Sequence, residues 1–107
     1  MNNEYYIVVG NANPELEIQL KRENTPIDLT TVDSVELFVK YSKTQAITNS
    51  GNQSMDIITP VSGIVSWQPE VADFPNPGVY IGNVKIVYSD QKPEILYEQL
   101  IIFARKI

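Results

Sequence analysis

The sequence predicts an all-β protein, an antiparallel β-sandwich of about seven strands in a single domain. Short segments in which apolar and polar residues alternate recur along the 107 residues, and segments rich in Gly, Pro, Asn and Asp separate them. No segment keeps a helical period over a useful length, because Pro75 and Pro77 stop the best candidate, 69–74. We expect one domain over residues 1–107, since a chain of this length buries roughly two-thirds of the surface it exposes when unfolded.

Two predicted strands open the chain. Residues 4–9 are rich in aromatic and β-branched residues and apolar on both faces, which is typical of a strand covered on two sides or lying against another subunit. Residues 15–21 alternate without interruption between apolar and polar side chains, which is typical of a half-buried strand. The side chains of this second strand that are expected to face the core are Leu16, Ile18 and Leu20.

A turn and a crossover lead to the third predicted strand. The turn at 22–26 contains Asn, which tolerates a left-handed backbone, and Pro, which has no N–H to donate to a ladder. We expect the crossover to close one end of the core with Ile27 and Leu29. Residues 33–41 then alternate again, with Phe38 as an aromatic residue on the nominally polar face. The side chains expected on the inward face are Val35, Leu37, Val39 and Tyr41.

The middle of the chain is expected to hold a polar loop and two short strands. Residues 42–54 are rich in Ser, Thr, Asn and Gln, which predicts a mobile loop or an irregular edge strand. Residues 55–59 and 64–67 are apolar enough to form short strands, and the turn at 60–63 separates them.

The stretch 73–90 predicts the central strand of the domain. Turn-forming residues enclose a segment whose apolar face is expected to point inward, and a hairpin then leads to the last strand, 94–105. Because residues 100–103 are apolar on both faces, we expect a β-bulge near Glu98 and Gln99 to shift the register. The inward side chains of the central strand are expected to be Tyr80, Val84, Ile86 and Tyr88.

The composition removes the usual parts of several kinds of functional site. The chain has no cysteine and no histidine, so it lacks disulfides, thiolate ligands and the commonest general base. Its net charge of −5, with a pI near 4.5, would repel the phosphate backbone of a nucleic acid. No apolar run approaches the ~20 residues of a membrane span, and the N-terminus lacks the basic segment of a signal peptide. We expect a soluble protein made in the cytoplasm, with no cofactor and no nucleic-acid or membrane partner.

Trp67 has two readings, an exposed aromatic platform for a sugar or peptide and a core anchor at the end of a strand. We favour the anchor, because Gly82 on a neighbouring strand lacks a side chain and glycine in a strand often marks a close approach. The expectation is that the indole of Trp67 packs over Gly82.

Tyr80 is expected to lock a corner of the sandwich. The spacing of Asp73, Gly78 and Tyr80 is similar to the corner at the start of the sixth strand in immunoglobulin-like sandwiches, where a tyrosine hydroxyl bonds back to a connecting loop. Gly82 stands where antibody domains have their second cysteine. The fold class is therefore expected to be an immunoglobulin-like antiparallel β-sandwich.

Several aspartates lie in or beside the predicted turns, which raises the alternative of a calcium site at one end of the sandwich. No D-x-D-x-D-G loop is present, and turn aspartates ordinarily cap their own backbone, so we expect no metal site. No pattern in the sequence places two carboxylates together beside a cleft, and the Ser and Thr residues lack a general base. We therefore expect that the protein is not an enzyme. The aspartates in question are Asp28, Asp33, Asp56, Asp73 and Asp90.

Excess apolar residues predict a surface that another subunit covers. Val79, Ile81 and Val87 fall on the face of the central strand opposite Tyr80, and Phe38 is expected to join them from another strand. One face of the last strand, at Ile101 and Phe103, adds to the same surface, and the doubly apolar first strand adds Tyr5 and Ile7. The alternative is ordinary scattered apolar surface.

Three segments together resemble a known family. They are L-K-R-E-N-T-P-I-D-L-T-T-V-D-S-V-E-L-F-V-K at 20–40, G-I-V-S-W-Q-P at 63–69 and P-G-V-Y-I-G-N-V-K-I at 77–86. They are similar to the immunoglobulin-like domain at the N-terminus of phage baseplate upper proteins and related tail or fibre proteins. The resemblance implies a virion structural module, assembled in the host bacterial cytoplasm, that docks to other virion proteins or to copies of itself.

The family's proteins often continue into a helical or receptor-binding part. This chain ends at Ile107, directly after the last predicted strand, so we expect a free-standing accessory domain or a fragment. The competing hypothesis is a bacterial carbohydrate- or peptide-binding module that uses loop tips and exposed tyrosines. A ligand-binding module is expected to expose Trp67 or several tyrosines around a groove, whereas an assembly domain is expected to expose a flat aliphatic surface.

Overall fold

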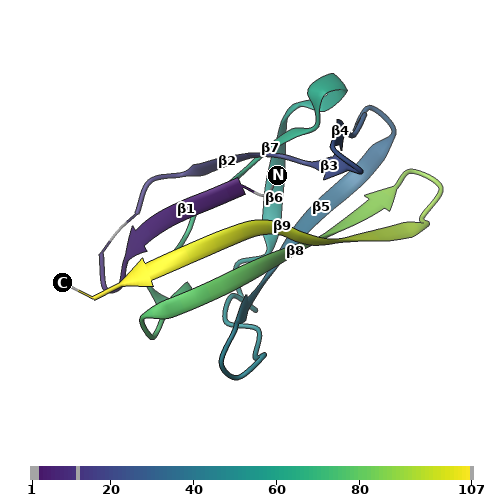
Figure 1. The fold of residues 1–107 in the computed structure, drawn as a ribbon. Coiled ribbons are helices and arrows are strands. Elements are labelled where there is room, and N and C mark those ends of the chain that lie inside the picture. Colours follow the sequence, from purple (N-terminus) through teal and green to yellow (C-terminus); the bar gives the residue numbers. More distant parts are fainter. Residues whose placement is uncertain (1–2, 12, 107) are drawn as a thin grey trace.

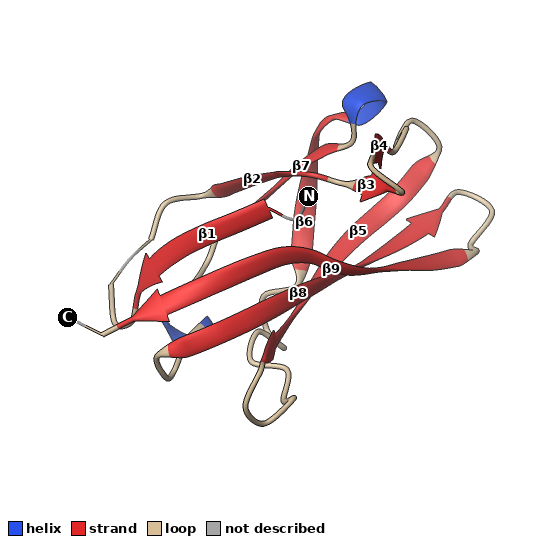
Figure 2. Cartoon of the chain, viewed as in Figure 1, coloured by secondary structure: helices blue, strands red, loops and turns tan. Residues whose placement is uncertain are grey.

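The computed structural model describes residues 3–11 and 13–106, and this part of the chain is all-β. Figures 1 and 2 show strands joined by short connections and two single 3₁₀ turns. The strands are β1 (Asn3–Val8), β2 (Leu16–Gln19), β3 (Lys21–Arg22), β4 (Thr25–Pro26), β5 (Val32–Tyr41), β6 (Ser54–Thr59), β7 (Ile64–Trp67), β8 (Gly78–Tyr88) and β9 (Pro93–Arg105), and the 3₁₀ turns are η1 (Pro60–Ser62) and η2 (Val71–Asp73). Within the described residues, no helix has the length and apolar character needed to cross a membrane.

Seven strands form one curled sheet in the order β1-β9-β8-β5-β6-β7-β2, and β3 and β4 form a small separate hairpin. Strand β6 joins two layers, because it starts beside β5, with Met55 opposite Val35, and continues beside β7, with Ile57 opposite Val65. The sheet therefore turns over at β6, and β7 and β2 lie across from β9, β8 and β5 (Figure 1). This arrangement is compatible with the expected β-sandwich.

The sheet is mixed, so the expectation of a wholly antiparallel sandwich is wrong at one pair. Strand β1 runs parallel to β9, with Tyr5 opposite Ile102 and Val8 opposite Arg105. A hairpin imposes antiparallel pairing on strands that follow each other, but β1 and β9 are the first and last strands of the chain. The long connection between them leaves the direction of pairing free.

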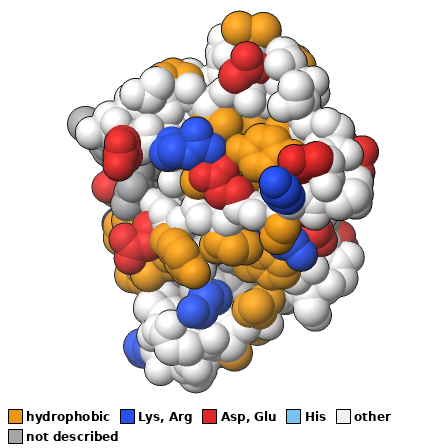
Figure 3. Space-filling model, turned by 90° about the vertical axis from the view of Figure 1, so that its right-hand side faces the viewer, with side chains coloured by type: hydrophobic (Ala, Val, Ile, Leu, Met, Phe, Trp, Pro, Cys, Tyr) orange, Lys and Arg blue, Asp and Glu red, His pale blue; other side chains and the backbone are white. Residues whose placement is uncertain are grey.

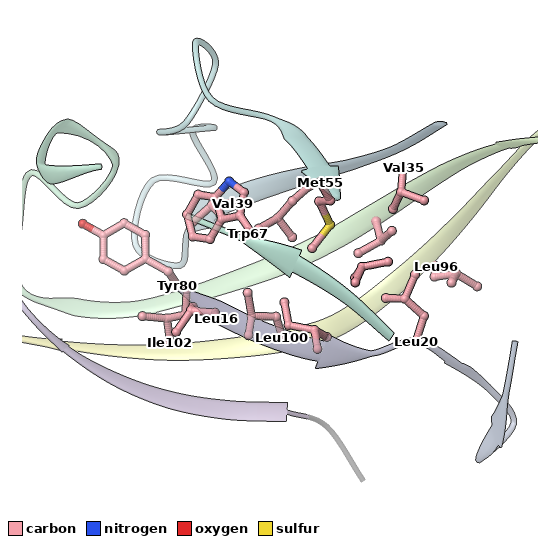
Figure 4. Close-up of a cluster of buried hydrophobic side chains, with 14 of the residues drawn as sticks. Leu16, Leu20, Val35, Val39, Met55, Trp67, Tyr80, Leu96, Leu100 and Ile102 are labelled. Atoms are coloured by element: carbon pink, nitrogen blue, oxygen red, sulfur yellow. The ribbon is translucent and has the colours of Figure 1, made fainter. Parts of the chain in front are cut away.

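The core lies between the two layers and is filled by the side chains that the alternation pointed inward. Leu16, Ile18 and Leu20 are buried on and after β2, and Ile27 and Leu29 are buried in the crossover, as expected. Figure 4 shows side chains of β2, β5, β7, β8 and β9 meeting in one cluster. The largest fully buried side chains are Trp67, Tyr80 and Phe74.

Strand β8 is central to its layer, with β5 on one side and β9 on the other. The register against β9 shifts between the pairs Gly82–Leu100 and Val84–Leu96, so β9 carries extra residues there. Glu98, within that bulge, has a positive φ of 53°. The bulge expected near Glu98 is therefore confirmed. Leu96 before the bulge and Leu100 after it both point inward, because β9 advances four residues where β8 advances two.

Candidate interaction surface

The outer face of β5, β8 and β9 carries a concentration of apolar side chains. Strand register places them side by side, since Ile81 lies opposite Ile101 on β9 and opposite Lys40 on β5, and Val79 lies opposite Phe103. Two further side chains of β9 point outward: Ile95, opposite Lys85 before the bulge, is 44% exposed, and Tyr97, within the bulge, is 71% exposed. We call this surface the outer face; its apolar members are Phe38, Val79, Ile81, Val87, Ile95, Tyr97, Ile101 and Phe103.

Strand β1 extends the outer face by one aromatic residue. The ring of Tyr6 stacks on the ring of Phe103, with centroids 5.1 Å apart and an angle of 20° between the planes. Tyr6 nevertheless remains 68% exposed. Four adjacent strands therefore contribute apolar side chains to one continuous side of the sheet. A contiguous apolar surface of this kind is typical of a site that a partner protein covers.

A shallow groove of about 570 Å³ crosses the outer face between β5 and the first half of β9. Figure 3, viewed from the side of the β8–β9 hairpin, shows hydrophobic side chains in a band across the middle of the molecule, with both basic and acidic side chains beside it. Lys40 and Lys85 line the groove, and no carboxylate does. The remaining lining residues are Phe38, Gln45, Ile47, Asn83, Pro93, Ile95 and Tyr97.

The segment 42–53, which contributes Gln45 and Ile47 to the groove, is held against the edge of β5 by Asn49. The Asn49 side chain is 1% exposed; its Oδ1 accepts the Val39 N–H at 2.9 Å and its Nδ2 donates to the Leu37 carbonyl at 2.9 Å. The side-chain amide thus replaces the peptide group of a neighbouring strand. The sequence predicted a mobile loop or an irregular edge strand here, and polar composition alone gave no sign of this anchor.

The interface residues predicted on β5 and β8 lie on the outer face. Phe38, Val79, Ile81 and Val87 are each partly exposed there. The addition of Ile7 is wrong, because this side chain is 2% exposed and belongs to the core. The doubly apolar pattern of β1 arises from burial of one face by this chain's own second layer.

Tyr5, the other predicted interface residue on β1, points toward the second layer. Its hydroxyl donates a hydrogen bond to the Glu17 carbonyl on β2, and burial raises the pKa of Tyr5. Tyr5 is largely covered within the chain, so it closes the gap between β1 and β2 more than it offers a surface to a partner.

Trp67 is a core residue, as favoured, but its neighbours differ from those expected. It is 1% exposed, its Nε1–H donates to the Asn52 carbonyl at 2.9 Å, and its ring meets Phe74 edge-on at 6.1 Å. A Cβ added at Gly82 would instead meet the side chains of Leu37 and Leu100, both at 3.0 Å. The expected packing of Trp67 over Gly82 is therefore wrong, since strand neighbours occupy that space.

The Tyr80 corner has the predicted hydrogen bond. The Tyr80 hydroxyl donates to the Asn76 carbonyl at 2.6 Å and accepts the Asn76 N–H at 3.2 Å, and burial raises the pKa of this hydroxyl. Tyr41 lies against the ring of Tyr80, with centroids 4.8 Å apart, and its own hydroxyl donates to the Pro77 carbonyl at 2.9 Å. Two tyrosines therefore fix the loop before β8.

Three of the turn aspartates cap backbone groups, as the sequence suggested. Asp28 accepts the Thr30 N–H at 3.0 Å, Asp90 accepts the Lys92 N–H at 3.1 Å, and the buried Asp73 accepts the Glu70 N–H at 2.9 Å. The described residues contain no group of three or more acidic side chains placed to hold a metal ion. These three carboxylates therefore stabilise the turns in which they lie.

An ion pair that the sequence did not suggest lies beside the β8–β9 hairpin. The Arg22 guanidinium donates to both oxygens of Glu94, and the Tyr88 hydroxyl donates to the same carboxylate. The hydrogen bonds from Arg22 hold the pKa of Glu94 below its ordinary value, while burial and the bond to Glu94 raise the pKa of Tyr88. Because 72 positions separate Arg22 from Glu94, no local pattern could have paired them.

Sequence comparison adds no relative, since no protein-family model and no curated protein matches this chain. The outer face is a surface that the chain itself leaves uncovered and lines with apolar side chains.

Proposed function

We propose that this chain is a non-enzymatic structural module of a phage virion, in the baseplate, tail or a fibre, that works by docking to other virion proteins. The observation that carries the proposal is the outer face, where four adjacent strands present apolar side chains on one side of the sheet. Burying such a surface against another protein is the ordinary way in which it is stabilised. The resemblance of segments 20–40, 63–69 and 77–86 to a phage tail family supplies the virion setting.

The polar groups inside the domain support a structural role. Asn49 ties its own loop to the backbone of β5, and Asp73 and the Tyr80 hydroxyl bond backbone groups of loops that connect strands. Each of them is committed to holding a loop, and the chain carries neither a histidine nor a cysteine with which to activate a nucleophile. The chemistry present supports recognition of a surface.

The alternative for the same face is binding of a carbohydrate or a peptide. Tyr97 is 71% exposed and lies beside Asn83 and Gln45, a combination of aromatic ring and amides that suits a sugar. Against it, Trp67, the strongest candidate platform, is buried in the core. The aliphatic side chains that surround Tyr97 favour a protein partner.

Incorporation into particles tests the proposal. Three forms of the chain are each expressed in cells infected by the phage that encodes it: wild type, Ile95→Lys and Ile58→Lys. The amount of each form in purified particles is then measured by immunoblot. Ile95 and Ile58 are 44% and 51% exposed, but Ile58 lies on β6, outside the groove, so the two variants are matched in chemistry and exposure.

We expect wild type and Ile58→Lys in particles, and Ile95→Lys folded but excluded from them. Equal incorporation of both variants would contradict the outer face as the docking surface. Absence of the wild-type chain from particles would contradict the virion role itself, and binding to a glycan array lost in Tyr97→Ala would then favour the carbohydrate alternative.

A further inference from the structure

The groove on the outer face combines an apolar floor with two lysines and no lining carboxylate. Lys40 and Lys85 line it, while no Asp or Glu does, although the whole chain carries 13 acidic and 8 basic residues. Glu36 lies opposite Lys85 in the strand register, and Glu98 lines the hollow next to Lys40. Among the described residues, however, the recorded ion pair is Arg22 with Glu94, and neither groove lysine takes part in it.

We propose that the groove receives an extended apolar segment of a partner protein that carries carboxylates about four residues apart. This inference rests on the proposed docking function and specifies the chemistry of the partner. The two lysines are partly buried, so their aliphatic stems cover the groove while their ammonium groups stay available. A partner carboxylate near each ammonium group would form an ion pair with a lysine that has no ion pair within the described chain.

The strand register sets the spacing. Lys40 lies opposite Ile81, and Ile81 precedes Lys85 by four residues on β8. Four residues of strand span ~13 Å, and the step to the neighbouring strand adds ~5 Å sideways, so the two lysine Cα atoms lie about 14 Å apart. In an extended partner segment, residues i and i+4 point the same way at nearly this distance, with residue i+2 between them over the apolar floor.

Charge also argues against a second copy of the same groove as the occupant. A two-fold pairing of groove on groove would bring the lysines of both copies together, and a carboxylate lines neither groove. Like charges at an interface favour a different partner. The occupant we assign is therefore an acidic and apolar segment of another protein.

The test is a titration of the isotope-labelled chain with three capped peptides, followed by backbone amide shifts in NMR spectra. The peptides share the pattern X-Thr-Ile-Thr-X, with X as Glu, Gln or Lys. We expect shifts at Phe38, Ile95 and Tyr97, and an affinity for the Glu peptide about three- to tenfold higher than for the Gln peptide, since two exposed ion pairs add modestly. The Lys peptide is expected to bind weakest.

Two double variants separate the effect of these lysines from that of general charge. Lys40→Gln with Lys85→Gln is expected to remove the preference for Glu over Gln. The matched control, Lys43→Gln with Lys106→Gln, removes two exposed lysines outside the groove and is expected to keep the preference.

Equal binding of the Glu and Gln peptides in the groove would overturn the acidic partner and leave the docking function standing. Concentration-dependent shifts in the groove without peptide would assign it to a second copy and also overturn this inference. Shifts that avoid the outer face with all three peptides would overturn the inference, and together with normal incorporation of Ile95→Lys they would overturn the docking function too.

Discussion

Replacing Asn49 with alanine is the sharpest test of how the edge of β5 is held. Three hydrogen bonds depend on this side chain: from the Val39 N–H at 2.9 Å, to the Leu37 carbonyl at 2.9 Å and to the Asn52 carbonyl at 3.0 Å. Asn49→Ala removes all three and leaves the Val39 N–H and the Leu37 carbonyl at a buried strand edge, while the Asn52 carbonyl keeps its bond from the Trp67 Nε1–H. A buried backbone group that loses its partner still bears the free-energy cost of its removal from water, and the hydrogen bond no longer offsets that cost.

The magnitude follows from the number of bonds. At ~0.5–1.5 kcal/mol for each net hydrogen bond, three bonds amount to about 1.5–4.5 kcal/mol. Relaxation of the segment 42–53 will admit water to part of the exposed edge and recover some of this loss. We therefore expect Asn49→Ala to lower the free energy of unfolding by about 2–4 kcal/mol, in the range of the larger single-substitution effects.

Urea unfolding followed by tryptophan fluorescence measures this change. Trp67 is the single tryptophan of the chain and is 1% exposed, so its emission reports exposure of the core. With a slope of ~1–3 kcal/mol per molar urea, the expected loss moves the unfolding midpoint down by about 0.7 M or more.

Asn76→Ala is the matched control. Asn76 is exposed, and both of its bonds with the Tyr80 hydroxyl run through its backbone, so alanine keeps them. The control is expected to change stability by less than about 0.5 kcal/mol. If Asn49→Ala unfolded at the same urea concentration as Asn76→Ala, the claim that this side chain fixes the edge of β5 would be refuted.

Three further predictions concern the core, the corner and the surface ion pair. Gly82→Ala should lower the free energy of unfolding by about 1–3 kcal/mol in urea titrations, because its Cβ would lie 3.0 Å from two leucine side chains in a filled core. Tyr80→Phe should lower it by about 1–2 kcal/mol in the same assay, through loss of the hydroxyl bond to the loop. The Arg22 bonds lower the pKa of Glu94, so this pair stabilises the fold above the ordinary carboxyl pKa near ~4.3 and loses its effect as pH falls through the lowered value. Between about pH 5 and 3, the thermal midpoint of wild type should therefore fall more steeply than that of Glu94→Gln; equal slopes would contradict the linkage.

Local patterns in the sequence were sufficient for the parts of the fold that depend on near neighbours. The alternation around Ile18 identified an inward face because side chains of a strand point to opposite sides in turn. The bulge near Glu98 was predicted because the residues after it are apolar on both faces of the strand. The Tyr80 corner was predicted from local spacing, and its hydrogen bond joins residues four positions apart. Each of these depends on residues close together along the chain.

What the sequence missed depends on residues brought together from far apart. The parallel pairing of β1 with β9 joins the two ends of the chain, and it is this pairing that puts Ile7 in the core. The pair of Arg22 and Glu94 joins a turn to a distant hairpin. Ile95 and Tyr97 could have been found on the outer face by continuing the alternation past the buried Leu96, whereas Ile47 reaches it from an irregular segment that no period describes.

Stability and recognition meet in the segment 42–53. Asn49 ties this segment to the edge of β5 from the buried side, while Gln45 and Ile47 of the same segment line the groove on the outer face. Backbone bonds from the Tyr41 N–H to the Ala46 carbonyl and from the Thr48 N–H to the Val39 carbonyl hold the same segment, so this wall of the groove is fixed by bonds to β5. A segment fixed before binding loses little conformational entropy when a partner arrives, so under the proposed docking function the buried amide of Asn49 helps by keeping one wall of the groove in place.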